Sequence, residues 1–174
     1  MKKISITAPS MLFFYGAIGE PKDSLDIMIG QMIQIGITDF GDASVRNELR
    51  NLIKTGKVGG VILFEKNLQK EDTKVALKKM IEELQKEANI PLFVAIDEEG
   101  GYVNRLKPKY GFPKTVSAAY LGAIDDLDST KFYSTQTAQT LSSLGFNINY
   151  APSVDVAINP NNPVIVKNKR SYSK

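Results

Sequence analysis

Two patterns of apolar and polar residues alternate along the chain from Asp23 onward. Short apolar runs of strand length occur at about 31–36, 58–64, 90–96 and 146–151. Between them, apolar residues recur at helical spacing over about 43–55, 71–88 and 130–144. Strands that alternate with helices predict βαβ units and therefore a parallel sheet. We expect an α/β fold of about four parallel strands with flanking helices and right-handed crossovers.

The helix expected over 71–88 has the clearest pattern. Its apolar stripe is formed by Val75, Leu77, Met80, Ile81 and Leu84, with lysines and glutamates on the other face. Such a stripe predicts a helix that packs one side against the sheet.

The most informative segment follows the third apolar run. Asp97, Glu98 and Glu99 come directly after it, the pair Gly100-Gly101 follows, and Arg105 lies eight residues after Asp97. Ligands of α/β folds gather at the carboxyl ends of strands. A carboxylate and a planar guanidinium facing one pocket suit a ligand with many hydroxyl groups. The alternative is that the three acids only open a helix or line a solvated turn.

Two further polar segments follow predicted strands. Phe64-Glu65-Lys66-Asn67 comes after the second, and Tyr150 to Val156, which contains Asp155, comes after the fourth. An aspartate in a proline-containing loop is more often a turn residue than a catalyst. Arg170, in the Asn- and Pro-rich final segment, is by itself most simply interpreted as a solvated charge.

Composition narrows the function classes. At 174 residues with 43% hydrophobic and 24% charged residues, the chain is typical of one soluble globular domain. The net charge of +3 is small and the lysines are scattered, which disfavours nucleic acid as a partner. Cysteine and histidine are absent, which excludes thiol chemistry and histidine as base or metal ligand in these residues.

The first 22 residues form a separate segment. Lys2 and Lys3 precede a mostly apolar stretch that ends in small residues, a layout shared by signal peptides and by poorly ordered leaders. If this segment is a signal peptide, the protein is expected to be periplasmic or secreted. If it is not, a cytoplasmic protein is expected. No later stretch approaches the roughly 18 apolar residues of a spanning helix, so we expect no membrane span.

Several segments together resemble a known family. They are IGQMIQIG, GGVILFEKN, AIDEEGGYVNRL, GFP, LGFNINYAPSVDV and NPNNPVIVKNKRSYS. In this order they are similar to the amino-terminal domain of glycoside hydrolase family 3, and most like its bacterial β-N-acetylglucosaminidase (β-N-acetylhexosaminidase) branch. The resemblance implies a TIM-type (β/α) barrel and retaining hydrolysis of a glycosidic bond in an N-acetylglucosamine-containing glycan. No metal or cofactor is implied.

The resemblance also assigns roles to residues. Asp97, Arg105 and Arg170 match positions that bind the terminal N-acetylglucosamine, and Asp155 matches a position that supports a loop. Tyr102 departs from the arginine or other polar residue common at its position. No residue here matches the family's acid/base or nucleophile, so we expect no catalytic residue in this chain and no activity of the chain alone.

A TIM barrel has eight strands and about 250 residues. With four expected strands, residues 23–174 are interpreted as the amino-terminal half of the catalytic domain. We expect its open edge to self-associate or to pair with a carboxyl-terminal half. The alternatives are a non-catalytic sugar-binding module and a member of the β-glucosidase or β-xylosidase branch.

Overall fold

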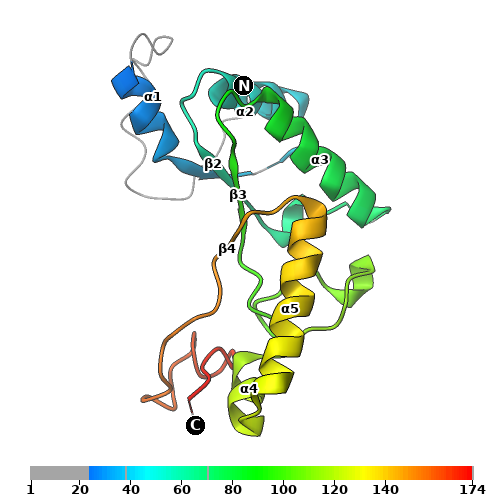
Figure 1. Ribbon diagram of the computed structural model, residues 1–174, viewed down its shortest axis with the longest axis vertical. Coiled ribbons are helices and arrows are strands. Elements are labelled where there is room, and N and C mark those ends of the chain that lie inside the picture. Colours follow the sequence, from blue (N-terminus) through cyan, green and yellow to red (C-terminus); the bar gives the residue numbers. More distant parts are fainter. Residues whose placement is uncertain (1–23, 38, 70, 174) are drawn as a thin grey trace.

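Four short parallel strands form the centre of the protein. The computed structural model describes residues 24–37, 39–69 and 71–173, so the leader expected over 1–22 lies outside the described residues. The strands are β1 (Gln34–Gly36), β2 (Gly60–Leu63), β3 (Phe93–Ile96) and β4 (Ile148–Asn149). They pair in parallel in the order β1-β2-β3-β4, which confirms the predicted sheet (Figure 1).

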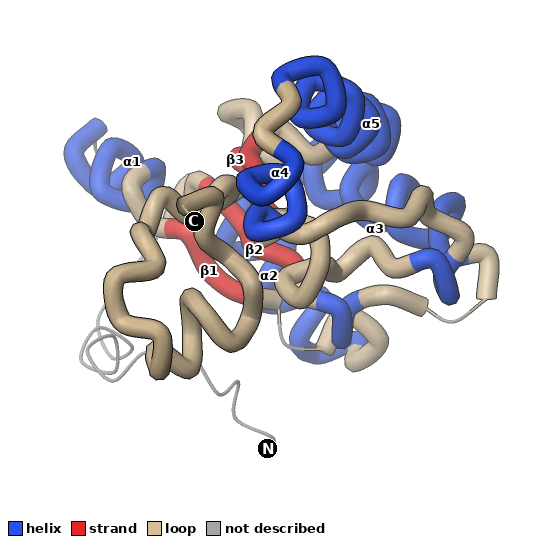
Figure 2. The backbone as a smooth tube through the Cα atoms, turned by 90° about the horizontal axis from the view of Figure 1, so that it is seen from below, coloured by secondary structure: helices blue, strands red, loops and turns tan. Residues whose placement is uncertain are grey.

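Five helices surround the sheet in the described part of the chain, and three of them cover one of its faces (Figure 1). They are α1 (Ser24–Gln31), α2 (Ala43–Lys54), α3 (Thr73–Glu87), α4 (Ala118–Ile124) and α5 (Leu127–Leu144), with the short 3₁₀ turns η1 (Glu65–Asn67) and η2 (Pro108–Tyr110). Helices α2, α3 and α5 lie on the same side of the sheet, and α3 contacts both of the others (Figures 1 and 2). No helix in the described ranges is long and apolar enough to cross a membrane.

The hydrophobic core fills the space between these helices and the sheet. Val61 and Leu63 of β2 and Val94 and Ile96 of β3 are at most 1% exposed and belong to one core cluster. Because side chains alternate along a strand, Phe93 points to the opposite face, where it is 52% exposed. That second face is the inner face of the curled sheet.

One hydrogen bond links side chains from the two ends of the sheet. The Tyr150 hydroxyl, directly after β4, donates a hydrogen bond of 2.7 Å to Oε1 of Gln34 in β1. A side chain of β1 and one from the residue after β4 therefore meet across the inner face, as expected for part of a barrel.

The strands are shorter than the apolar runs predicted. The run at 31–36 begins inside α1, because Gln31 still belongs to that helix. The fourth strand has only two residues, since it leads directly into the Ala151-Pro152 peptide and proline cannot donate to a ladder.

The expected helices did not include α4, which begins where Ser117 Oγ accepts a hydrogen bond from the Tyr120 backbone N–H. The α3 stripe packs on the core through Leu77, Met80, Ile81 and Leu84, as expected. The inclusion of Val75 was wrong: it is 69% exposed, because about 100° of rotation per residue places it on the side of the helix opposite Leu84.

Candidate functional site

The loop after β3 turns sharply at two glycines. The backbone N–H groups of Glu99 and Gly100 both donate to the Val103 carbonyl, at 2.9 and 3.1 Å. Gly100 and Gly101 have φ of +87° and +61°, a region that residues with a side chain rarely adopt. A Cβ on Gly100 would lie 2.3 Å from the Val116 carbonyl oxygen. The glycine pair therefore allows the loop to fold back and bring Arg105 toward Asp97.

Asp97 and Arg105 form an ion pair at the carboxyl end of β3. Nη2 of Arg105 lies 3.2 Å from Oδ2 of Asp97, and each side chain is 26% exposed. The pair is thus partly shielded but accessible from solvent, as a polar contact for a ligand must be.

Glu98 lies between the two other acids and points inward. Its Oε2 accepts hydrogen bonds from the backbone N–H groups of Arg105 and Leu106, at 2.8 and 3.0 Å. The residue is 3% exposed, and burial raises the pKa of its carboxyl group. Oε1 is buried without a hydrogen-bond partner in the described part of the chain. Glu98 thereby holds the backbone that carries Arg105.

Glu99 brings the final segment of the chain to this loop. Arg170 makes a bidentate contact with the Glu99 carboxylate: Nη2 donates to Oε1 at 2.7 Å and Nε donates to Oε2 at 2.9 Å. The pKa of Arg170 is raised by Glu99 first, and Asp155 and Asp97 add further attraction. Arg170 therefore lies within electrostatic reach of Asp97, although 71 residues separate it from Glu99.

The asparagines flanking Ile148 tie β4 to β3 through their side chains. Asn149 Oδ1 accepts from the Glu98 N–H at 2.9 Å, and its Nδ2 donates to the Glu98 carbonyl at 3.1 Å. Asn147 makes the equivalent bonds to the Val94 N–H and the Leu92 carbonyl, at 2.7 and 2.9 Å. Sequence reasoning missed Asn149, although the alternation of asparagine and isoleucine in FNIN marks both side chains as sharing one direction.

A second cluster joins the loops after β2 and β3. Glu65 of η1 binds Lys107 Nζ at 2.5 Å, Lys109 Nζ at 2.9 Å and the Tyr110 hydroxyl at 3.1 Å. Hydrogen bonds from Lys107 and Lys109 lower the pKa of Glu65 to about 2. This cluster holds η2, which follows Arg105, against the end of β2.

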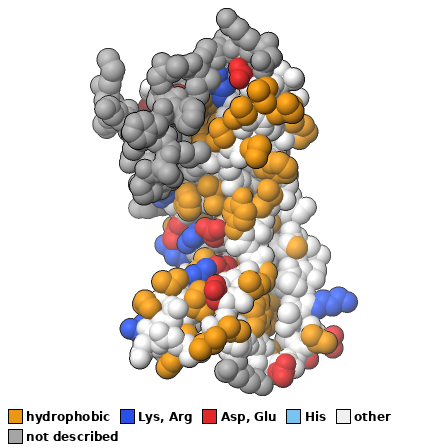
Figure 3. Space-filling model, turned by 90° about the vertical axis from the view of Figure 1, so that its left-hand side faces the viewer, with side chains coloured by type: hydrophobic (Ala, Val, Ile, Leu, Met, Phe, Trp, Pro, Cys, Tyr) orange, Lys and Arg blue, Asp and Glu red, His pale blue; other side chains and the backbone are white. Residues whose placement is uncertain are grey.

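The structure thus brings Asp97, Arg105 and Arg170 to one edge of the sheet, together with Glu99, which sequence reasoning did not assign. Asp155 accepts a hydrogen bond of 3.0 Å from the Ser153 hydroxyl within its own loop. On the side of the molecule away from α3 and α5, acidic and basic side chains gather at mid-height, with hydrophobic side chains above and below them (Figure 3). Among the described residues, no group of three or more acids is placed to hold a metal ion.

The polar cluster lies at the carboxyl ends of parallel strands, which is where α/β proteins of the barrel class place their ligand sites. Residues 24–174 match the family model described as the glycosyl hydrolase family 3 N-terminal domain. The chain therefore belongs to glycosyl hydrolase family 3, which confirms the family resemblance of its sequence motifs.

Named relatives agree with this assignment. The chain is 40% identical over 133 residues to "Beta-hexosaminidase A" of Pseudoalteromonas piscicida, covering 73% of this chain and 22% of that protein. It is 32% identical over 116 residues to a "Beta-hexosaminidase" of Alkalilimnicola ehrlichii, covering 63% and 32%. The chain thus spans about a fifth to a third of the length of these curated relatives.

Solved structures of the family share the fold. A family 3 glycosyl hydrolase from Mycobacterium smegmatis superposes with a TM-score of 0.59 and 25% identity, covering 87% of this chain and 39% of that one. NagZ from Neisseria gonorrhoeae gives 0.58 and 27% identity, covering 71% and 37%. These likenesses confirm a TIM-barrel-like α/β fold, of which the described residues form four strands.

Proposed function

We propose that this chain forms the N-acetylglucosamine-holding part of a retaining, β-N-acetylglucosaminidase-like glycoside hydrolase. The observation that carries the proposal is the convergence of the Asp97–Arg105 and Glu99–Arg170 pairs at the carboxyl edge of a family 3 sheet. Partly exposed, ionised donors and acceptors make strong hydrogen bonds to sugar hydroxyls. The names of the β-hexosaminidase relatives support an N-acetylhexosamine as the sugar.

In this proposal each residue has a separate task. Asp97 accepts hydrogen bonds from sugar hydroxyls, while Arg105 and Arg170 donate to hydroxyl oxygens from either side. Glu99 orients Arg170 through the bidentate contact, and it is only 7% exposed, so it acts through the arginine. Residues 23–174 would then correspond to the amino-terminal half of the catalytic barrel.

We also propose that the chain alone binds the sugar without cleaving it. Retaining hydrolysis requires a nucleophilic carboxylate and a separate proton donor about 5 Å apart. Asp97 and Glu99 are each paired with an arginine. Glu98 has the raised pKa of a proton donor, but it is 3% exposed and faces the backbone of Arg105 and Leu106. The ion pairs of Asp97 and Glu99 also favour the second candidate function, which is a sugar-binding module without catalytic activity.

Calorimetric titration with N-acetylglucosamine tests the binding proposal. We expect binding by the chain, loss of that binding in Asp97→Ala, and unchanged binding in Asp128→Asn, which neutralises an exposed acid on the first turn of α5. Equal affinity of Asp97→Ala and the unaltered chain would sink the proposal. Titration with glucose and xylose separates the glucosidase and xylosidase branches, since those sugars lack the acetamido group.

A further inference from the structure

The carboxyl group of Glu98 is buried, and only one of its two oxygens has a hydrogen-bond partner within the described ranges. Oε2 accepts from the backbone N–H groups of Arg105 and Leu106, at 2.8 and 3.0 Å. Oε1 has no donor there. A buried carboxylate needs partners at both oxygens to offset the loss of its water. This environment therefore suits a neutral carboxyl group better than a charged one.

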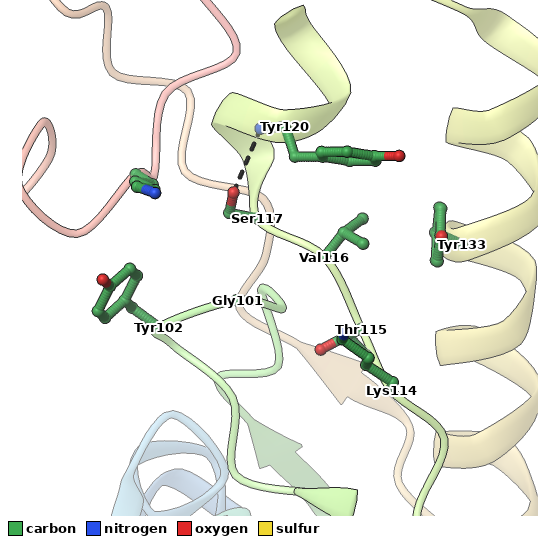
Figure 4. Close-up of a pocket in the computed structure, with 9 residues that line it drawn as sticks. Gly101, Tyr102, Lys114, Thr115, Val116, Ser117, Tyr120 and Tyr133 are labelled. Carbon is green, nitrogen blue, oxygen red and sulfur yellow. Dashed lines mark hydrogen bonds between the residues drawn. The ribbon is translucent and has the colours of Figure 1, made fainter. Parts of the chain in front are cut away.

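The segment before α4 and helix α5 enclose this carboxyl group. Figure 4 shows residues 114–117 running between the loop at Gly101 and α5, and the Gln136 amide of α5 donates to the Lys114 carbonyl at 3.3 Å. Glu98 lines two cavities, of about 10 and 210 Å³, on this side of the loop. Among the described residues of α5, no charged side chain lines either cavity. The helix thus offers Glu98 no counter-ion.

The charges of the loop itself do not outweigh this burial. Burial raises the pKa of Glu98, and it exceeds the opposing effects of the two backbone N–H groups and of the Arg105 and Lys107 charges. The other titratable side chains beside Glu98 are its neighbours Asp97 and Glu99, which are paired with arginines, and Tyr133 and Tyr172 of the larger cavity. The described conformation of the loop therefore favours the protonated form of Glu98.

We propose that Glu98 is a positioning residue, and that its protonated form holds Arg105 in place to bind sugar. The inference rests on the function proposed above, in which Arg105 is a sugar ligand. With Glu98 neutral, its Oε2 holds the Arg105 backbone, and the Arg105 guanidinium reaches Asp97 at 3.2 Å. When Glu98 releases its proton to solvent, its carboxylate gains hydration only if the loop opens. Opening moves Arg105 away from Asp97 and weakens the sugar site.

The affinity of the chain for N-acetylglucosamine should consequently depend on pH. A group with a raised pKa stabilises the described loop fully below its ordinary value of 4.5, and this contribution is lost as pH rises through the raised value. N-acetylglucosamine itself has no ionisable group in this range. Calorimetric titration at several pH values between 4.5 and about 8 should show affinity that falls as pH rises.

Substitutions at position 98 separate the proton from the side chain. Glu98→Gln keeps an oxygen that accepts both N–H groups but cannot ionise, so its sugar affinity should not fall as pH rises. Glu98→Leu leaves both N–H groups without an acceptor and should bind about tenfold more weakly at every pH. Glu82→Gln, which neutralises an exposed acid of α3, is the matched control and should keep the pH dependence of the unaltered chain.

Hydrogen exchange of the Arg105 and Leu106 amides, followed by NMR, tests the same inference without sugar. Protection is measured relative to the exchange rate of an unstructured chain at each pH. We expect it to fall as pH rises in the unaltered chain and to stay constant in Glu98→Gln, because only the unaltered chain can ionise at this position.

The outcomes separate this inference from the proposed function. If the sugar affinity of the unaltered chain and of Glu98→Gln changes equally with pH, or if amide protection does, Glu98 does not act through its proton and the inference is overturned, while the sugar site stands. If no variant binds N-acetylglucosamine at any pH, the proposed function fails, and amide exchange alone decides whether the proton of Glu98 holds the loop.

Discussion

Replacement of Asn149 by alanine tests how the short fourth strand supports the strand-end cluster. The substitution removes the bonds from this side chain to the N–H and the carbonyl of Glu98. Glu98 is the residue between Asp97 and Glu99, so the change loosens the backbone on which both acids are held. Asn147→Ala is a matched control, because it removes the equivalent pair of bonds to Val94 and Leu92 at the start of the strand.

The expected loss of stability follows from the number of bonds. Each asparagine makes two side chain–backbone hydrogen bonds, and each contributes about 0.5–1.5 kcal/mol net. Both variants should therefore lower the free energy of unfolding by about 1–3 kcal/mol. The ladder itself remains, since the backbone N–H of Tyr150 still donates to the Ile96 carbonyl at 2.9 Å.

Urea unfolding and calorimetry separate the two effects. Urea unfolding should show similar destabilisation in both variants. Titration with N-acetylglucosamine, under conditions where both are folded, should show weaker binding only in Asn149→Ala. Equal sugar affinity of Asn149→Ala and Asn147→Ala would refute the claim that Asn149 positions the acids of the site.

Three further predictions concern pH and association. The lowered pKa of Glu65 makes its ion pairs stabilising above its ordinary value of 4.5, and this stability is lost as pH falls toward about 2. Acid unfolding should therefore show Glu65→Gln less stable than the unaltered chain by about 1 kcal/mol at pH 6 and equal to it near pH 2, whereas a pH-independent gap would contradict this. The raised pKa of Glu98 acts in the opposite sense, because the folded state favours the protonated carboxyl group. The stability of the unaltered chain relative to Glu98→Gln should therefore fall as pH rises above 4.5. A difference in urea midpoints that stays constant with pH would count against this prediction. Finally, within the described ranges β1 and β4 each pair with a strand on one side only and Phe93 is half-exposed, which predicts self-association of the isolated chain. Light scattering that gives a monomer at high concentration would disprove this prediction.

Sequence reasoning located the third strand and its carboxyl end well because the signals there are local. Val94, Ala95 and Ile96 at the end of the apolar run are buried, and Asp97 begins a polar loop whose glycines have the positive φ values that favour glycine. Asp97, Arg105 and Arg170 lie at one edge of the sheet, but their role as sugar ligands stays a prediction.

What the sequence could not indicate depends on contacts between distant segments. Glu98 looks like a surface acid beside two others, yet it is buried because its carboxylate accepts backbone N–H groups seven and eight residues away. Glu99 pairs with Arg170 only because the last residues of the described chain fold back onto the loop after β3. Val75, by contrast, could have been excluded from the stripe by sequence alone, because about 100° of rotation per residue places it on the side of α3 opposite Leu84.

A crystal structure of the chain soaked with N-acetylglucosamine tests the central claim most directly. The sugar should lie at the carboxyl edge of the sheet, with hydroxyl groups within about 3.2 Å of Asp97, Arg105 and Arg170. A sugar bound elsewhere, with these three side chains unchanged and without contact to it, would contradict the assignment of this edge as the sugar site.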